Sequence, residues 1–393
     1  MQNFYYSVPT KAYFGKGVVS KIGELAKEFG KKAMLLHYGD GVVEKIGVYK
    51  AVTDSLKANG IDYAELTGIM PNPHITKVDE GVALARREGV DLLIPIGGGS
   101  CIDTAKCIAG CYGYDGPAWD VILDKSLVRD CLPIIAVPTL AATGSDMDPG
   151  AMVHNEATHE KKQLLHPDVF PKYSLLDPEY TYSVPRKQTA FGVADIMSHI
   201  MEVYFSKTEG AFLADRIMEA MLRTCVKYGT IACNDPYNYE ARANLLWVAA
   251  WGCNGFTGCG KKPCRWSVHP MEHEIAAFYN DPHGQGIAIL TAPWMRYVLN
   301  DYTADMFAAF GVNVLDLEPS EDKFETANRA IDALENLFRS WGIPKNLRES
   351  GIGLTDDSKF EIMAEKAIGT ADKLNGCVPL SKEDIINIYQ AAF

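Results

Sequence analysis

The sequence predicts an α/β region followed by an all-helical region. Up to about residue 185, short apolar runs alternate with amphipathic stretches, an order typical of a parallel sheet flanked by helices. Beyond Pro185, helical patterns follow one another and no strand-like run remains. A chain of 393 residues is long for one core, so two domains are expected. We place them at 1–185 and 186–393.

The expected elements follow in chain order. Runs rich in apolar residues predict strands at 33–38, 62–66, 91–96, 133–138 and 173–177. The amphipathic stretches between them predict helices at 17–29, 42–58, 75–88 and 100–112. In the second domain, turn-forming residues interrupt the helical patterns at 234–236, 258–263, 342–344 and 351–353.

The composition argues against several classes of function. A formal net charge of −12 disfavours nucleic acid and anionic membranes as partners. No stretch approaches the roughly 20 apolar residues of a membrane span, and the N-terminus shows no export signal. The ten cysteines lack a disulfide-framework spacing, and Cys253, Cys259 and Cys264 are spaced unlike a zinc knuckle. We expect a reduced, cytoplasmic protein in which these three thiols are buried or lie on the surface, with a pocket-lining role for one of them as the alternative.

A glycine-rich turn follows the buried run at 91–96. Three glycines at 97–99 allow the backbone to approach a ligand closely, and Ser100 with Asp103 has the pattern of a capping box. A helix N-terminus offers free N–H groups and the positive end of its dipole, which suits a pyrophosphate. A tight strand–helix turn without a ligand is the alternative, but the cap and the preceding strand favour phosphate binding.

Two further polar segments stand at strand ends. Thr139, Thr143 and Ser145 follow the fourth strand-like run, at the end where open α/β sheets bind ligands. Asp40 follows the first, where an acid can accept from ribose hydroxyls. Because Glu44 occupies the third glycine position of the Gly-x-Gly-x-x-Gly fingerprint, a standard dinucleotide fold is disfavoured, although the architecture is similar.

Carboxylate and imidazole groups cluster in the second domain. Asp195 and His199 lie four residues apart, as do His269 and His273, so each pair can share one helix face. With His283, three of the nine histidines fall within fifteen positions. Four such groups form a set suited to a borderline divalent ion such as Fe2+ or Zn2+.

These histidines also have other interpretations. Each can be a satisfied core residue, and His269–His273 is formally an inverted zinc-protease motif. Pro270 inside that motif suits a protease core helix poorly, and a peptidase would leave the glycine turn unexplained. Together the features favour an enzyme in which a metal holds an oxygen while a dinucleotide accepts or donates hydride.

Further motifs extend along the whole chain. They are Phe14-Gly15-Lys16-Gly17, Pro71-Asn72-Pro73, Gly97-Gly-Gly-Ser-x-x-Asp103-x-x-Lys106, Ala142-Thr-Gly-Ser145, Leu176-Asp177-Pro-x-Tyr180-Thr-Tyr182, Asp195-x3-His199 and His269-x3-His273-x9-His283-Gly284-Gln285. In these residues and this order, the chain resembles the iron-containing (group III) alcohol dehydrogenases, most closely their butanol dehydrogenase branch. The resemblance implies a dehydroquinate synthase-like fold: an α/β N-terminal nucleotide-binding domain and an all-α C-terminal domain, with the site in the cleft between them.

The resemblance also implies roles for individual residues. It makes Asp195, His199, His269 and His283 the ligands of Fe2+ or Zn2+, and puts His273 beside the nicotinamide as a catalytic residue that does not bind the metal. The implied cofactor contacts are Asp40, Asn72, Gly98, Gly99, Ser100, Asp103, Thr139, Thr143, Ser145, Lys162 and Tyr180. The alignment of Lys162 is the loosest, because Lys161 precedes it.

The turn after the first strand favours NAD(H) over NADP(H). NADP-dependent relatives carry a Gly-Gly-Gly-Ser-like turn where this chain has Gly39-Asp40-Gly41-Val42. Asp40 replaces a glycine, and Val42 replaces the hydroxyl that would meet a 2′-phosphate.

The implied reaction interconverts a primary alcohol such as butanol and its aldehyde, in an enzyme whose relatives are usually homodimers. A lyase or cyclase of the dehydroquinate synthase type would also use nicotinamide and metal. It should show more basic residues around a phosphate or carboxylate substrate, and this region is not rich in them. A non-catalytic metal or nucleotide sensor is a third hypothesis, which an absorbance assay with butyraldehyde and NADH discriminates.

Overall fold

In the computed structural model, the described residues divide into two compact units. The structure describes residues 1–263 and 266–393, so Cys264 lies outside the described residues. The sheet unit comprises Ser7–Val184 and Tyr237–Ala250. The helical unit comprises Met1–Tyr6, Pro185–Pro236 and Trp251–Phe393. The domain limits of 1–185 and 186–393 stay a prediction, which limited proteolysis would test.

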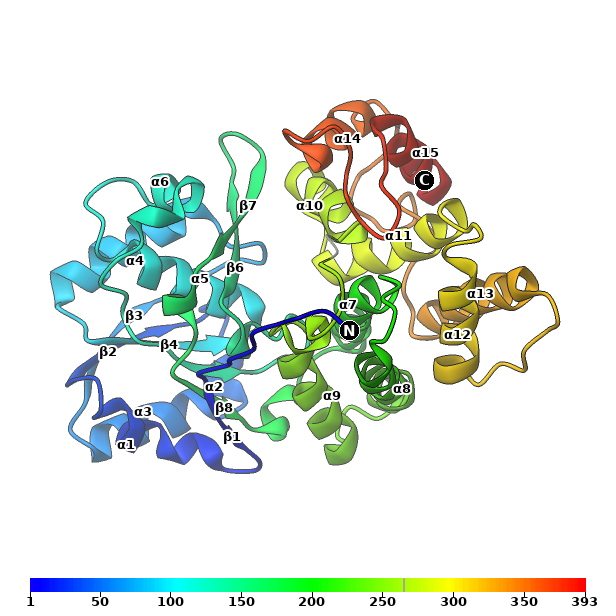
Figure 1. Cartoon of the computed structure of the whole chain (residues 1–393). Helices are drawn as coiled ribbons and strands as arrows, with labels where there is room; N and C mark the ends of the chain where they lie inside the picture. Colours follow the sequence, from blue (N-terminus) through cyan, green and yellow to red (C-terminus); the bar gives the residue numbers. More distant parts are fainter. Residues whose placement is uncertain (264–265) are drawn as a thin grey trace. The chain divides into compact units, whose positions relative to one another are not determined.

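Six parallel strands of the described residues form the sheet of the sheet unit, in the order β1-β8-β5-β4-β2-β3 (Figure 1). Their bounds are β1 Lys11–Phe14, β2 Lys32–Leu36, β3 Asp62–Leu66, β4 Leu92–Gly97, β5 Ile135–Pro138 and β8 Tyr173–Leu176. Every residue of the central strand β4 is buried, as expected for a strand covered on both faces.

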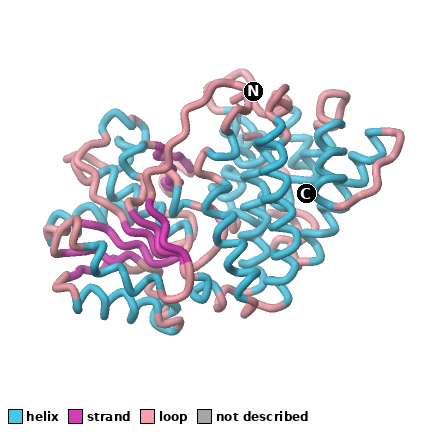
Figure 2. The backbone as a smooth tube through the Cα atoms, turned by 60° about the horizontal axis from the view of Figure 1, so that its bottom comes forward, coloured by secondary structure: helices cyan, strands magenta, loops and turns pink. Residues whose placement is uncertain are grey.

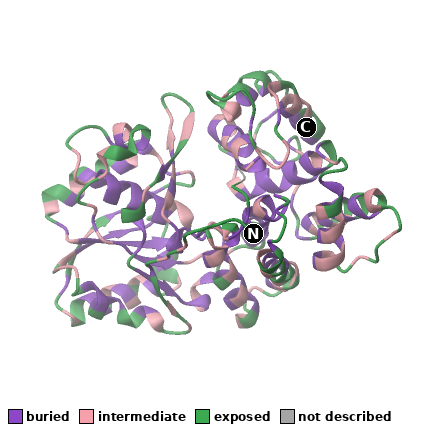
Figure 3. Ribbon diagram, viewed as in Figure 1, coloured by how far each residue is buried: buried purple, intermediate pink, exposed green. Residues whose placement is uncertain are grey.

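Helices cover both faces of this sheet (Figure 2). Alternate residues of β2 point to opposite faces: Ala33 and Leu35 join one hydrophobic core, while Met34 and Leu36 join the other. On the first face lie α1 (Ile22–Ala26), α2 (Val42–Lys45) and α3 (Val48–Ala58). On the second lie α4 (Ile75–Glu88), α5 (Gly99–Cys111) and α6 (Ala118–Leu123). Purple ribbon marks these buried layers in Figure 3.

The strand order reverses between β2 and β4. The chain runs from β2 outward to β3, then returns to β4 on the other side of β2 and continues to β5. Open α/β sheets bind ligands outside the carboxyl ends of their strands at such a reversal. The glycine turn after β4 and the Asp40 turn after β2 lie on either side of this reversal in strand order.

The predicted α/β fold is confirmed, with differences in detail. The strand at Asp62–Leu66 and the helix at Ile75–Glu88 have their predicted limits. The helix predicted at 42–58 is interrupted at Gly47, whose φ is 82°. The sequence patterns did not predict β1, α6 or the antiparallel hairpin of β6 (Gly150–Asn155) and β7 (Glu160–Leu165).

The helical unit lacks named strands among its described residues, as predicted. Its helices are α7 Arg186–Tyr204, α8 Phe212–Asn234, α10 Val268–Tyr279, α11 His283–Tyr297, α12 Ala304–Leu315, α13 Lys323–Ser340, α14 Phe360–Ile368 and α15 Lys382–Ala392. The helix α9 (Tyr239–Gly252) lies almost wholly in the sheet unit. Packed between α8 and α11, α7 is buried on nearly all sides. No described helix is both long and apolar enough to cross a membrane.

Candidate functional site

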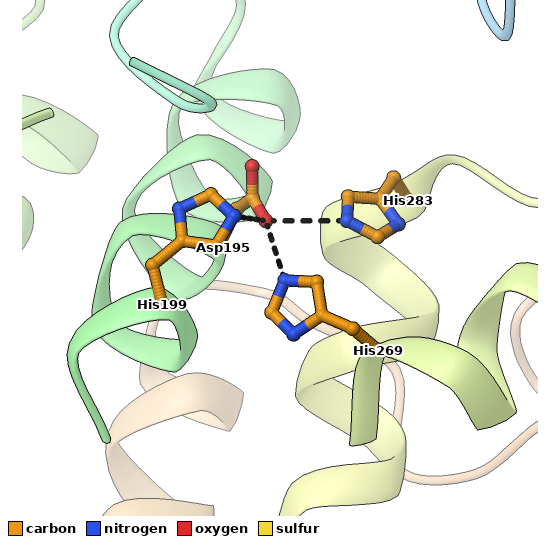
Figure 4. Close-up of side chains that lie close together, drawn as sticks. All are labelled: Asp195, His199, His269 and His283. Carbon is orange, nitrogen blue, oxygen red and sulfur yellow. Dashed lines mark ion pairs between the residues drawn. The ribbon is translucent and has the colours of Figure 1, made fainter. Parts of the chain in front are cut away.

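Four side chains of the helical unit converge on one point (Figure 4). Asp195 and His199 lie one turn apart on α7, His269 lies in the first turn of α10, and His283 begins α11. Oδ1 of Asp195 is 3.4 Å from Nε2 of His199, 3.4 Å from Nε2 of His283 and 3.8 Å from Nε2 of His269. The four candidate donor atoms all lie within 4.8 Å of one another.

The donor set and its spacing fit a divalent metal. Two donors that are each about 2.1 Å from a tetrahedral ion lie about 3.4 Å apart. Asp195, His199 and His269 are only 2–4% exposed, so their polar atoms face few water molecules. Nε2 of His269 is buried and makes no hydrogen bond to any residue that the structure describes. Buried polar atoms of this kind are costly unless they have a partner, and a metal would supply one.

Close approach of two helices helps to form this cluster. Gly284 follows His283 in the first turn of α11, and a Cβ at Gly284 would lie 2.2 Å from the carbonyl oxygen of Phe191 on α7. Glycine therefore allows the start of α11 to approach the backbone of the helix that carries Asp195.

Two buried glutamates orient the imidazoles. Oε1 of Glu202 is 2.9 Å from Nδ1 of His269, and Oε2 of Glu272 contacts Nδ1 of His283. Because an ionised carboxylate only accepts hydrogen bonds, each glutamate holds a proton on Nδ1 and leaves Nε2 as a donor atom. Such carboxylate–histidine pairs commonly support metal-binding histidines.

His273 lies beside the cluster. Its ring centroid is 5.5 Å from that of His283 and 6.2 Å from that of His269. It also groups with Glu272 and His283 as a possible cation site. Because His283 belongs to both groups, we do not interpret this group as a second, independent metal site.

Most of the predicted cofactor residues follow the carboxyl ends of the sheet strands. Asp40 follows β2, Asn72 follows β3, and Tyr180 follows β8. Gly98, Gly99 and Ser100 follow β4, and Thr139, Thr143 and Ser145 follow β5. A Cβ at Gly99 would lie 2.6 Å from Oγ1 of Thr143, so glycine lets the turns after β4 and β5 pack together.

The capping box predicted at Ser100 and Asp103 is wrong. Helix α5 begins at Gly99 with Gly98 as its N-cap, and no side chain caps it. The Asp103 carboxylate instead accepts from the hydroxyl of Ser145 at 2.5 Å and from the backbone N–H of Met152 at 2.9 Å. Burial raises the pKa of Asp103 to about 6. In this arrangement Asp103 joins the turn after β5 to the hairpin.

The Asp40 turn and the hairpin lysines have distinct surroundings. Asp40 is exposed and its Oδ1 accepts from the backbone N–H of Val42 at 3.0 Å. On β7, Lys161 donates to Oδ1 of Asn72 at 3.1 Å, whereas Lys162 is half-exposed and pairs with Glu160 at 3.8 Å. The structure thus brings Lys161, rather than Lys162, next to another predicted cofactor residue.

Comparison with known proteins identifies the family. One family model, iron-containing alcohol dehydrogenase, matches residues 9–178, and the C-terminal model of the Fe-containing alcohol dehydrogenase family matches residues 189–393. The chain belongs to the iron-containing alcohol dehydrogenase family. It is 46% identical over 394 residues to NADH-dependent butanol dehydrogenase A of Clostridium acetobutylicum, covering 100% of both chains. It is 34% identical to the NADPH-dependent aldehyde reductase YqhD of Escherichia coli, covering 93% of both.

Solved structures agree with this membership of the iron-containing alcohol dehydrogenase family. The crystal structure of NADH-dependent butanol dehydrogenase A from Thermotoga maritima matches with a TM-score of 0.93 and 34% identity, over 100% of this chain and 99% of that one. The predicted family and fold class are therefore confirmed, while the roles of individual residues stay predictions. Glu202 and Glu272 were not singled out as orienting groups. The available signal for Glu202 was its spacing, seven residues after Asp195 and so on the same face of α7.

Proposed function

We propose that this protein is a metal-dependent alcohol dehydrogenase that interconverts primary alcohols such as butanol and their aldehydes with NAD(H). The observation that carries the proposal is the convergence of Asp195, His199, His269 and His283 in a chain of this family. Full-length similarity to a protein named NADH-dependent butanol dehydrogenase A supports the substrate class and the cofactor.

In this proposal the four converging side chains bind Fe2+ or Zn2+. Three neutral imidazoles and one carboxylate leave a net charge of about +1 on a divalent centre, which favours attraction of a substrate oxygen. The family name supports iron. Zn2+ generally binds such donors more tightly than Fe2+, so purified protein can hold zinc even where iron is used in the cell.

The chain's own residues have separate tasks in the reaction. A bound ion would supply Lewis acidity toward the carbonyl oxygen, and NADH would supply the hydride. Asp195 provides the negative charge of the centre, and Glu202 and Glu272 hold the donor tautomers of His269 and His283. His273, beside the cluster, is our candidate to relay the proton that the product oxygen needs, since imidazole carries protons well near neutral pH.

The carboxyl edge of the sheet is the proposed site of NAD(H). We assign the pyrophosphate to Gly98, Gly99 and Ser100 at the start of α5. Asp40 is positioned after β2 to accept from the adenosine ribose, which favours NAD(H) over NADP(H). The bond from Lys161 to Asn72 leads us to propose Lys161 in the role first given to Lys162. Asp103, Thr139, Thr143, Ser145 and Tyr180 complete the proposed set.

A homodimer in the cytoplasm is the proposed physical state. The homodimer rests on the family resemblance, and sedimentation velocity would test it. A net charge of −12 favours a small neutral substrate over nucleic acid as the binding partner.

A single assay separates this function from the other two hypotheses. The metal-loaded enzyme is mixed with butyraldehyde and NADH, and absorbance is followed together with butanol formation. We expect one butanol for each NADH consumed, with NADPH used less efficiently. A lyase or cyclase would restore its nicotinamide in each turnover and show no net NADH loss. A sensor would show no turnover with any aldehyde.

A further inference from the structure

We propose that Glu202 is a positioning residue that joins the start of α10 to the His269 donor and thereby sets the affinity of the centre for its metal. The proposal rests on the metal ligands proposed above. Glu202 lies on α7, the helix that also carries Asp195 and His199. One helix therefore supplies two proposed ligands and the group that orients a third.

The Glu202 carboxylate is almost fully buried, at 5% exposure, and it accepts several hydrogen bonds. Its Oε1 accepts from the backbone N–H groups of Val268 and His269, each at 3.0 Å, and from Nδ1 of His269 at 2.9 Å. Its Oε2 accepts from the backbone N–H of Ser267. Burying a charge is costly unless it is paired, and here backbone amides at a helix N-terminus balance it.

Glu202 takes the place of the normal helix cap. Serine is a favoured N-cap residue, and Ser267 occupies the N-cap position of α10. Its side chain makes no capping bond, because its backbone is already helical with φ −105° and ψ −46°. Its hydroxyl also makes no hydrogen bond to any part of the chain that the structure describes. The first turn of α10 thus begins where Glu202 holds it, and His269 lies in that turn.

The same carboxylate controls the ring of His269. With the proton held on Nδ1, Nε2 faces Asp195 as a lone-pair donor. Without Glu202 the ring could carry its proton on Nε2 or rotate, and either change removes one donor from the set. Glu272 contacts the ring of His283. Glu202 contacts the ring of His269 and also the backbone at the start of α10, so it combines ring orientation with the helix start.

The test is metal affinity rather than activity. Metal-free wild type, Glu202→Gln and Glu202→Asp are titrated with Zn2+ against a chromophoric chelator, and the visible spectrum of Co2+ reports the donor set. Glutamine keeps the volume but turns an N–H group toward the amide of Ser267. We expect Glu202→Gln to weaken metal binding about 10- to 100-fold, the range for groups that support metal-binding histidines. Glu202→Asp keeps the charge and should recover part of the loss.

A matched control separates this effect from general loss of stability. Glu219 is another buried glutamate of the helical unit, and it accepts from the hydroxyl of Tyr204 at 2.6 Å and from Asn313 at 2.9 Å. Glu219→Gln should lower the melting temperature while leaving Zn2+ affinity and the Co2+ spectrum unchanged.

Two results would overturn the proposal: unchanged affinity in Glu202→Gln, or an equal loss in Glu219→Gln. Should Glu202→Gln fail to fold, Glu202→Asp is titrated in the same way. Its shorter side chain cannot reach every donor, so we expect it to bind Zn2+ more weakly than the wild type, and unchanged affinity would overturn the proposal. Failure of the proposed metal site gives another result, in which His283→Ala binds Zn2+ as tightly as the wild type.

Discussion

Two sets of buried carboxylates, one in each unit, differ in their partners. In the sheet unit, Asp148 pairs with the fully buried Lys106 at 2.8 Å, while Asp103 and Asp146 accept from serine hydroxyls. In the helical unit, Asp195 faces three imidazoles. A carboxylate paired with an ammonium group is neutralised within the protein. A carboxylate surrounded by neutral imidazoles keeps its negative charge, which a divalent ion can balance.

This contrast has consequences for how the two units respond to change. The candidate metal centre takes its donors from helices, and its imidazoles are oriented by further buried groups. Several candidate cofactor residues lie on turns after the strands, and one of these, Asp40, is exposed. We therefore expect substitutions at the metal centre to change metal binding and turnover almost completely. Substitutions at the turns should change cofactor preference only by degrees.

The largest effect is expected from removing a metal donor. His283→Ala should lower bound metal and turnover together. Turnover should fall by more than about 10³-fold, because Lewis acidity contributes several kcal/mol and each 1.36 kcal/mol is tenfold. Metal analysis and a steady-state assay of the same sample check this. His166→Ala, a histidine change in the sheet unit, should leave both unchanged. Full metal occupancy with normal turnover would remove His283 from the site.

A smaller effect is expected at His273, which we place beside the centre. His273→Ala should keep its metal and lose about 10²-fold or more in turnover, the lower end of the range for general acid–base groups. The dependence of turnover on pH near neutrality should also weaken. Metal content and pH–rate profiles provide the measurement. Loss of metal in this variant would mean that His269 and His273 have exchanged roles.

A substitution in the Asp40 turn should change the preference for NADH over NADPH by a moderate factor. Two unit charges 4 Å apart repel by about 4 kcal/mol at an effective dielectric constant of 20. Screening reduces the preference for NADH over NADPH to about 2–3 kcal/mol, or about 30- to 150-fold. Asp40→Gly should narrow this preference, because it removes the charge and releases the N–H group of Val42 toward a phosphate.

The measurement is kcat/KM for both reduced cofactors with one aldehyde. Glu44→Gln provides the control, since it removes an exposed acid of α2 that does not hold the turn. Equal efficiency with NADH and NADPH in the wild type would contradict the role of Asp40.

A further effect, on stability and not on turnover, is expected in the sheet unit. Burial raises the pKa of Asp146 to about 6. The folded state therefore binds more protons than the unfolded state between about pH 4 and pH 6, and stability falls as the pH rises through that window. Asp146→Asn should reduce this fall by at most about 3 kcal/mol, since one pKa unit is 1.36 kcal/mol. Urea unfolding of wild type and variant across the window checks the slope. An unchanged slope would mean that Asp146 is ionised in both states.

Some parts of the fold were predictable from local patterns. The helix Ile75–Glu88 was predictable because its buried residues Ile75, Val78, Val82 and Ala85 recur at helical spacing. The strand Asp62–Leu66 is mostly exposed, but its limits were predictable because it lies between Gly60 and Gly68, whose φ values are positive. Other parts carry weak patterns. The edge strand β1 has only four residues, mostly exposed, and β7 is rich in charged and polar residues. Such strands form because a neighbouring strand is available, which the local sequence does not report.

The candidate site shows the same limit. Spacing alone indicates that Asp195 and His199 share a face, but it cannot separate His269 from His273, since both fit one face of α10. Tertiary contacts distinguish them: Glu202, from another helix, holds the ring of His269 and the turn in which it lies. Likewise, the failed capping box at Asp103 reflects a partner 42 residues away, the hydroxyl of Ser145.

The most direct test of the proposed metal dependence is an anaerobic titration of metal-free enzyme with Fe2+, scored by NADH oxidation with butyraldehyde. We predict that activity rises linearly and reaches its plateau at one ion per chain, while His283→Ala shows no rise at the same additions. Full activity of the metal-free protein, with no response to added Fe2+ or Zn2+, would contradict the account.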